Sequence, residues 1–218
     1  MGKLTLVIGN KNYSSWSLRP WLLLKQAGIE FEEVKVALHQ DPSVILRYSP
    51  SGKVPVLMDG DTKIWESLAI CEYIAEKFPE KHLWPDDPKA RAFARSVSSE
   101  MHAGFQVLRQ NMPMNCQAKF PRKKMAPGVQ DDINRVTAIW HEARERYGKS
   151  GGMLFGRFSV ADAMFAPVAI RFMVYDVKLD LVSQTYQKTI LSLPVIQEWL
   201  MAAQAEAERI PEYEPAQN

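Results

Sequence analysis

The spacing of hydrophobic and polar positions changes repeatedly along the first eighty residues, and each change predicts a new element. Lys3 to Gly9 is a short apolar run that ends at glycine, which is typical of a buried strand. From Ser17 to Gly28 apolar positions recur at helical spacing, with serine near the start and glycine at the end. Phe31 to Val36 alternates as a strand does. The pattern therefore opens as β-α-β, with the first two strands parallel.

A β-hairpin is predicted next. Val54 to Met58 and Thr62 to Trp65 are rich in strand-forming residues, and Asp59-Gly60-Asp61 between them favours a turn. Pro55 has no N–H to donate, so it suits a sharp turn into an edge, and we expect a cis bond to point the Val54 backbone groups outward. Those backbone groups are then free to bind a peptide.

After the hairpin the apolar period changes to that of a helix, which begins at Glu66-Ser67. Leu68, Cys71, Ile74 and Phe78 share one face of it. A short helix is predicted over Asp41 to Tyr48. The first eighty residues therefore read βαβ-α-ββα, a four-stranded mixed sheet with helices on it.

The remainder of the chain shows no strand pattern. A proline-rich stretch predicts a linker over residues 81–88 between a first domain at 1–80 and an all-helical bundle at 89–218. Ser159-x-x-Asp162 predicts a capping box at the start of one helix. The expected helices of the second domain are Ala90 to Leu108, Val129 to Tyr147, Ser159 to Val174 with Pro167 as a kink, and Val195 to Glu208.

Composition and charge only exclude some classes of function. The 218 residues are 46% hydrophobic and 24% charged, with a net charge of +2. This balance is ordinary for a soluble protein and attracts neither nucleic acid nor an anionic membrane. No secretory signal or membrane-spanning run is evident, so we expect a cytoplasmic protein. Cys71 and Cys116 have no metal-ligand spacing, and we expect no metal and two reduced thiols, with Cys71 buried.

Three segments together resemble the glutathione transferase family. They are the loop Ser14-Ser15-x-Ser17-x-Arg19, the Val54-Pro55-Val56-Leu57 segment, and the helix start Glu66-Ser67-Leu68-Ala69-Ile70. The match is specific in the first eighty residues and weaker afterwards, where helix lengths and Ser159-Val160-Ala161-Asp162 agree. The resemblance implies a thioredoxin-like first domain, an all-helical second domain, glutathione as co-substrate and a homodimer.

The resemblance also implies a catalytic hydroxyl. A thiol with a pKa near 8.5 is mostly protonated at pH 7, and a hydroxyl just before a helix N-terminus stabilises the thiolate. The family's catalytic serine aligns with Ser14, with Ser15 as its close rival and Tyr13 as a distant one. Taken alone, the same serines are expected only to cap the helix, as N-terminal serines commonly do. Arg19 is expected to pair with an acidic group beneath the loop.

The ends of glutathione are assigned in the same way. Glu66 is expected to accept from the γ-glutamyl ammonium and Ser67 to bind its carboxylate, at a helix start that acidic and hydroxyl residues favour in any case. Val54 pairs with the cysteinyl unit through its backbone. The residues assigned to glutathione are Lys53, Val54, Pro55, Glu66, Ser67 and His39, of which Lys53 and His39 are expected to reach the glycyl carboxylate.

We therefore expect a glutathione transferase that conjugates glutathione to a small electrophile, as in detoxification. An apolar acceptor pocket is expected, lined by Trp16, Met112, Phe120 and Phe165. Two alternatives stay open. One is a zeta-type isomerase of maleylacetoacetate, although Trp16 stands where that branch usually has cysteine. Such an isomerase needs cations to hold the two carboxylates of its substrate, and Arg109, Lys119 and Arg171 are the only cations in or flanking the expected pocket segments. The other is a glutathione-binding or regulatory module without turnover.

Overall fold

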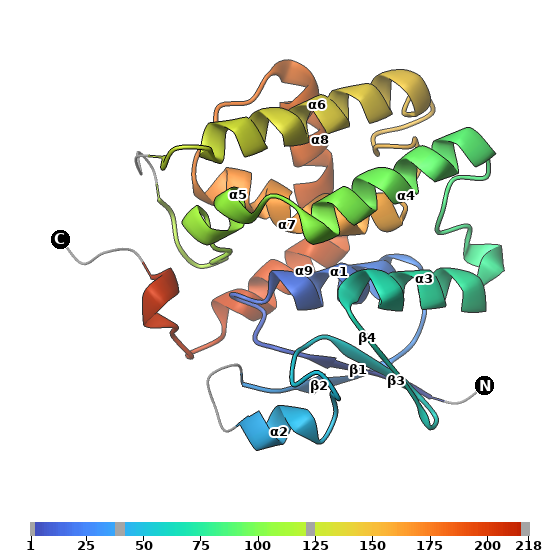
Figure 1. Cartoon of the computed structure of the whole chain (residues 1–218), viewed down its shortest axis with the longest axis vertical. Coiled ribbons are helices and arrows are strands. Elements are labelled where there is room, and N and C mark those ends of the chain that lie inside the picture. The colour runs from blue at the N-terminus through green and yellow to red at the C-terminus, as the bar shows by residue number, and fades with distance from the viewer. Residues whose placement is uncertain (1–2, 38–41, 121–124, 215–218) are drawn as a thin grey trace.

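A four-stranded mixed sheet organises the first part of the chain (Figure 1). The computed structural model describes residues 3–37, 42–120 and 125–214. The strands are β1 (Leu4–Ile8), β2 (Glu32–Lys35), β3 (Val56–Asp59) and β4 (Thr62–Trp65), in the order β2-β1-β3-β4. β1 pairs parallel with β2 and antiparallel with β3, and β3 pairs antiparallel with β4. The predicted parallel pair and hairpin are confirmed.

Three helices cover the sheet. α1 (Ser15–Gln26) and α3 (Ser67–Lys77) lie on one face and α2 (Pro42–Leu46) lies on the other (Figure 1). The period of two along β1 explains this arrangement. Leu6 and Ile8 enter the large core with α1 and α3, whereas Val7 between them packs with Ile45 of α2.

The rest of the described chain is helical. Its elements are a 3₁₀ turn (Pro79–Lys81), α4 (Pro88–Ala103), α5 (Gln106–Asn111), α6 (Val129–Tyr147), α7 (Val160–Val174), α8 (Leu181–Leu191), α9 (Pro194–Gln204) and a second 3₁₀ turn (Pro211–Tyr213). α1 contacts β1, α3, α7 and α9, so it is packed on both sides. This explains why Leu18 and the run from Trp21 to Leu24 are all fully buried.

The first helix of the second half of the chain is shorter than the sequence predicts. The helix expected over Ala90 to Leu108 breaks after Ala103, because Gly104 is extended and Phe105 takes a φ of 60° before α5 begins. A Cβ at Gly104 would lie 2.8 Å from the Glu100 carbonyl oxygen, so the break depends on glycine.

The sequence prediction also missed α8. Asp180 caps it by accepting from the backbone N–H groups of Val182 and Ser183, and Tyr186 and Ile190 are buried at helical spacing. The last predicted helix, Val195 to Glu208, corresponds to α9. It ends earlier than predicted, at Gln204, and Ala205 is its C-cap residue.

The predicted capping box at the start of α7 is confirmed, and its aspartate also bonds to residues outside this helix. The fully buried Asp162 carboxylate accepts from the Ser159 N–H and hydroxyl, both at 2.9 Å, from the Leu154 N–H at 3.0 Å and from the Tyr186 hydroxyl at 3.1 Å. Burial raises the pKa of Asp162 to about 6. One side chain therefore joins the start of α7, the loop before it and α8.

Asp162→Asn should lower the free energy of unfolding by about 2–4 kcal/mol, because the amide turns a donor toward donors that are already buried. Chemical denaturation of both proteins measures the difference. The matched control is Asp61→Asn at the exposed hairpin turn, which we expect to change the free energy by less than about 0.5 kcal/mol. Equal effects of the two substitutions would show that the network does not stabilise the fold.

Candidate functional site

Two adjoining cavities lie where the start of α1 meets the start of β3 and the helices. The larger one, of about 590 Å³, is lined by the loop from Tyr13 to Trp16, by the segment before β3, and by residues of α5, α7 and the C-terminal 3₁₀ turn. The smaller one, of about 330 Å³, reaches the start of α3. Both are lined by Trp16, Lys53, Val54 and Arg109, and we call the two cavities together the candidate site.

The residues assigned to glutathione in the described chain all meet in the smaller cavity. They are Lys53, Val54, Pro55, Glu66 and Ser67. The Val54–Pro55 bond is cis. His39 lies outside the described residues.

The start of α3 presents an acid and a helix N-terminus side by side. Glu66 takes a φ of 69°, its carboxylate lies 3.5 Å from His102 Nε2, and its side chain is half exposed. Burial, together with the charge of Arg19, lowers the pKa of His102. Ser67 is the first residue of α3, so its N–H has no acceptor within the helix. A carboxylate beside a helix N-terminus complements the ammonium and carboxylate of an amino-acid head group.

The two serines before α1 make different bonds. The Ser14 hydroxyl donates to Ser17 Oγ at 2.7 Å and accepts from the Ser17 N–H at 3.4 Å, so it acts as the helix cap. Ser15 Oγ instead accepts from Arg171 Nη2 at 3.1 Å. The described residues offer no acceptor for the Ser15 hydroxyl proton. Both serines line the larger cavity, but only the proton of Ser15 is available to a ligand.

Three arginines in the region of the candidate site lack an ion-pair partner among the described residues. Among the described residues, Arg19, Arg109 and Arg171 form no ion pair, so the acidic partner expected for Arg19 is not found. Arg19 Nη1 donates to Ser67 Oγ at 3.3 Å. Burial, and secondarily the charge of Arg109, lowers the pKa of Arg171 to about 10 and that of Arg19 well below its usual range. The site has the electrostatics of an anion-binding pocket.

Trp16 occupies the centre of this positive region. Its ring centre lies 4.3 Å from the Arg19 guanidinium carbon and 4.6 Å from that of Arg109, and His102 meets the ring edge-on. The indole lines both cavities, as expected for an acceptor-pocket residue. It offers an aromatic wall between cations.

The other three acceptor-pocket residues line neither cavity. Met112 is buried and its carbonyl accepts from Arg171 Nε, Phe120 stacks on Tyr175, and Phe165 packs edge-on against Trp140 in the helical core. The acceptor-pocket role of these three residues therefore stays a prediction. The larger cavity is lined by Tyr13, Arg109, Met114, Arg171 and Tyr213, among others. Arg109 and Arg171 are two of the three cations that the sequence placed in or beside the expected pocket segments.

The end of the described chain folds over the loop that carries the serines. Glu206 accepts from the N–H groups of Lys11 and Asn12, both at 2.9 Å. The Tyr13 hydroxyl bonds to the Glu214 carboxylate and accepts from the Ile210 N–H. Residues far apart in sequence therefore fix the loop before α1.

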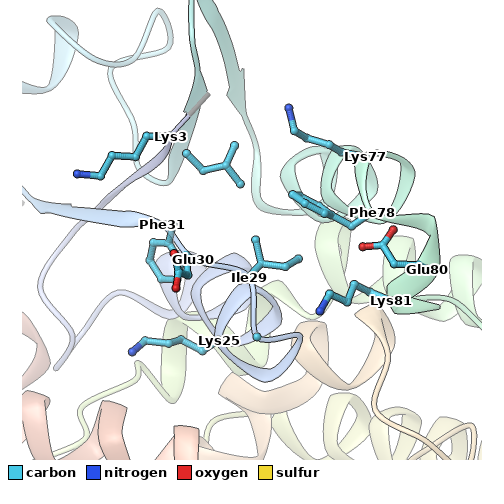
Figure 2. A pocket seen from close by; sticks show the side chains of 11 residues that line it. Lys3, Lys25, Ile29, Glu30, Phe31, Lys77, Phe78, Glu80 and Lys81 are labelled. Carbon is cyan, nitrogen blue, oxygen red and sulfur yellow. The ribbon is translucent and has the colours of Figure 1, made fainter. Parts of the chain in front are cut away.

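A larger hollow of about 970 Å³ lies at the other end of α1 (Figure 2). Apolar residues form its base, among them Ile29, Phe31 and Phe78. Its lysines are largely neutralised, because Lys3, Lys25 and Lys77 pair with Glu32, Glu198 and Asp59. Glu30 and Glu80 also line it, and it contains none of the candidate residues. We assign it no ligand.

Residues 3–37, 42–120 and 125–214 contain no group of three or more His, Cys, Asp or Glu placed to hold a metal ion. No helix in those ranges is long and apolar enough to cross a membrane. Cys71 and Cys116 are both buried free thiols, and burial raises the pKa of each to about 12.

Comparisons with known proteins point to one family. Residues 13–77 match the family described as "Glutathione S-transferase, N-terminal domain". The chain is 32% identical to glutathione S-transferase F13 of Arabidopsis thaliana, over 71% of this chain and 74% of that protein. It is 37% identical to the "Probable maleylacetoacetate isomerase" of Caenorhabditis elegans, over 43% of this chain and 44% of that one.

Some relatives are matched over only about half of their length. The chain spans about half of the worm protein and of rat glutathione S-transferase omega-1, at 44% and 52%. Among solved structures, a glutathione transferase homolog from Burkholderia with bound glutathione superposes with a TM-score of 0.71 at 21% identity, covering 94% of this chain and 100% of that one. This likeness shows the fold.

Glu206→Gln should loosen the loop before α1, because a neutral amide replaces a carboxylate that accepts two backbone N–H bonds. We expect a loss of about 1–3 kcal/mol in local stability, measured as faster hydrogen exchange at Lys11 and Asn12. Glu208→Gln, two residues on, is the control. Unchanged exchange at both amides in Glu206→Gln would contradict the clamp.

Proposed function

The chain belongs to the glutathione S-transferase family, and from this we propose that it is an enzyme that binds glutathione, ionises its thiol and adds the thiolate to a small electrophile. One observation carries the proposal. Ser15 stands at the N-terminus of α1 in the larger cavity, with its oxygen bonded to Arg171 and its proton available. A donor at a positive helix end lowers the pKa of a bound thiol.

Glutathione takes its orientation from the smaller cavity. Glu66 accepts from the γ-glutamyl ammonium, while Ser67 and the N-terminus of α3 bind the γ-glutamyl carboxylate. The Val54 backbone pairs with the cysteinyl unit, and Lys53 takes the glycyl carboxylate. The meeting of these residues in one cavity beside Ser15 supports the assignment.

We place the thiol contact on Ser15 and the capping role on Ser14. The sequence favoured Ser14, because the family motif aligns there. The hydroxyl of Ser14 already donates to Ser17 Oγ at 2.7 Å, so donating to a thiolate would require breaking that buried bond. Ser15 has no such commitment among the described residues.

Ser15→Ala should raise the pKa of the bound glutathione thiol and slow conjugation by about 2–4 kcal/mol in activation free energy, as removal of one positioned donor does. The dissociation constant of glutathione should change little. An ultraviolet titration of the thiolate, with steady-state kinetics, measures both effects.

Ser14→Ala is the matched control. It should cost about 0.5–2 kcal/mol of stability through the lost cap and leave the thiol pKa nearly unchanged. The reverse pattern, with the pKa change confined to Ser14→Ala, would return the catalytic role to Ser14.

Ser67→Ala and Glu66→Gln should each weaken glutathione binding by about 1–3 kcal/mol, because each removes a bond to a charged group. Calorimetric titration gives the dissociation constants, with Ser96→Ala on the exposed face of α4 as control. Unchanged affinity in both site variants would place the γ-glutamyl group elsewhere.

A second candidate function is glutathione-dependent isomerisation of an anionic substrate. Arg109, Arg171 and Lys53 line the larger cavity, and no described acidic residue does. A dianionic diacid needs such cations to hold its carboxylates. The resemblance to a worm protein named as a maleylacetoacetate isomerase points the same way.

Substrate charge tests the cations that line the larger cavity, and the reaction that is catalysed separates the two candidates. We expect a carboxylate-bearing aryl halide to be conjugated about tenfold more efficiently than its neutral analogue, through charge-assisted bonding to Arg109. Arg109→Gln should remove that preference. If maleylacetoacetate isomerisation exceeds conjugation a hundredfold at matched concentrations, the second function is the correct one, and glutathione binding without turnover of either substrate would identify a binding module.

Three expectations from the sequence stay predictions. They are the homodimer, the cytoplasmic location and the division into domains at residues 1–80 and 89–218. Sedimentation at varied concentration measures the first, and separate expression of the two segments tests the last.

A further inference from the structure

We propose that Arg171 and Arg19 are positioning residues, each of which holds one serine oxygen so that the serine proton is left to donate to glutathione. Arg171 orients Ser15 toward the thiolate, and Arg19 orients Ser67 toward the γ-glutamyl carboxylate. This inference rests on the proposed function and deepens it.

The first pair joins α7 to α1. Arg171 is 5% exposed, and its guanidinium donates to the Met112 carbonyl at 2.8 Å, the Pro167 carbonyl at 3.4 Å and Ser15 Oγ at 3.1 Å. Bonds in three directions fix the plane of the group. A guanidinium has only donors, so Ser15 is the acceptor in this bond and its own proton must point elsewhere.

The second pair joins α1 to α3. Arg19 is 2% exposed and donates to Ser67 Oγ at 3.3 Å. Its Nε has no partner among the described residues. The chemistry matches the first pair, because Ser67 accepts from Arg19 and its proton is free for a carboxylate.

Stabilisation of the fold does not explain why Arg171 and Arg19 are buried. A buried charge without a carboxylate partner is costly, and neither arginine forms an ion pair within the described ranges. Arg109 lowers the pKa of both, which adds a repulsive contribution. Glutathione brings two carboxylates and a thiolate to this region, so the ligand supplies the missing negative charge.

Substitution by methionine tests the pairs, because it keeps an unbranched side chain in the space of the arginine stem and removes every donor. Arg171→Met should raise the pKa of the bound glutathione thiol by about one unit, a tenfold change in its ionisation constant, with the dissociation constant changed less than about threefold. In a Ser15→Ala background, Arg171→Met should change the thiol pKa little further, since Arg171 acts through Ser15.

Arg19→Met should show the opposite division. We expect about tenfold weaker glutathione binding by calorimetry and an unchanged thiol pKa, with Ser67→Ala adding little in that background. Each variant is thus the control for the other. Equal changes of affinity and pKa in both would overturn the inference, because they would indicate only a general loss of positive charge.

Thermal unfolding shows whether the variants fold. We expect the midpoint to hold, because methionine removes a buried charge that lacks a carboxylate. A lower midpoint with unchanged affinity and pKa would show a merely structural role. If a methionine variant does not unfold cooperatively, Arg171→Lys and Arg19→Lys give the same readouts, since an ammonium cannot reproduce the fork of the guanidinium.

Failure of the proposed function would look different. In that case the unaltered protein would bind no glutathione, or would bind it without forming a thiolate. Binding and thiolate formation in the unaltered protein, with the same affinity and thiol pKa in Arg171→Met and Arg19→Met, would overturn the inference alone.

Discussion

Burial of α1 on two sides is the constraint on which the rest of the structure depends. The sheet packs on one side of this helix and α7 and α9 on the other, so Leu18 and Trp21 are completely buried. The start of α1 cannot move independently of α7. That is why Ser15 meets Arg171, a residue 156 positions later in the chain, at hydrogen-bond distance.

Positive charge without a protein partner is the second feature that defines the site. Burial of Arg19 and Arg171 costs free energy that a stable scaffold alone would not require. In the function we propose, an anionic ligand offsets that cost when it binds, and the bonds to Ser67 and Ser15 give the charges a direction. The same proposal favours an anionic acceptor over the apolar one expected from Met112, Phe120 and Phe165.

The sequence predicted local features well and contacts between distant segments poorly. The hairpin, the β-α-β opening and the capping box at Asp162 follow from periods, turns and caps within about twenty residues, and all three are confirmed. Lys53 and Ser67 meet because both flank the same hairpin. The burial of Phe165, by contrast, depended on which face of α7 meets Trp140 of α6. The break at Gly104 is local, but it rests on a close approach to the Glu100 carbonyl that periodicity does not show.

A pH titration of glutathione bound to the unaltered protein shows whether this site ionises the glutathione thiol. Ultraviolet absorbance of the thiolate gives the pKa of the bound thiol. We expect a value at least about one unit below the 8.5 of an ordinary thiol, because Ser15 and the positive end of α1 favour the charged form. A bound thiol that titrates like a free one would contradict this expectation.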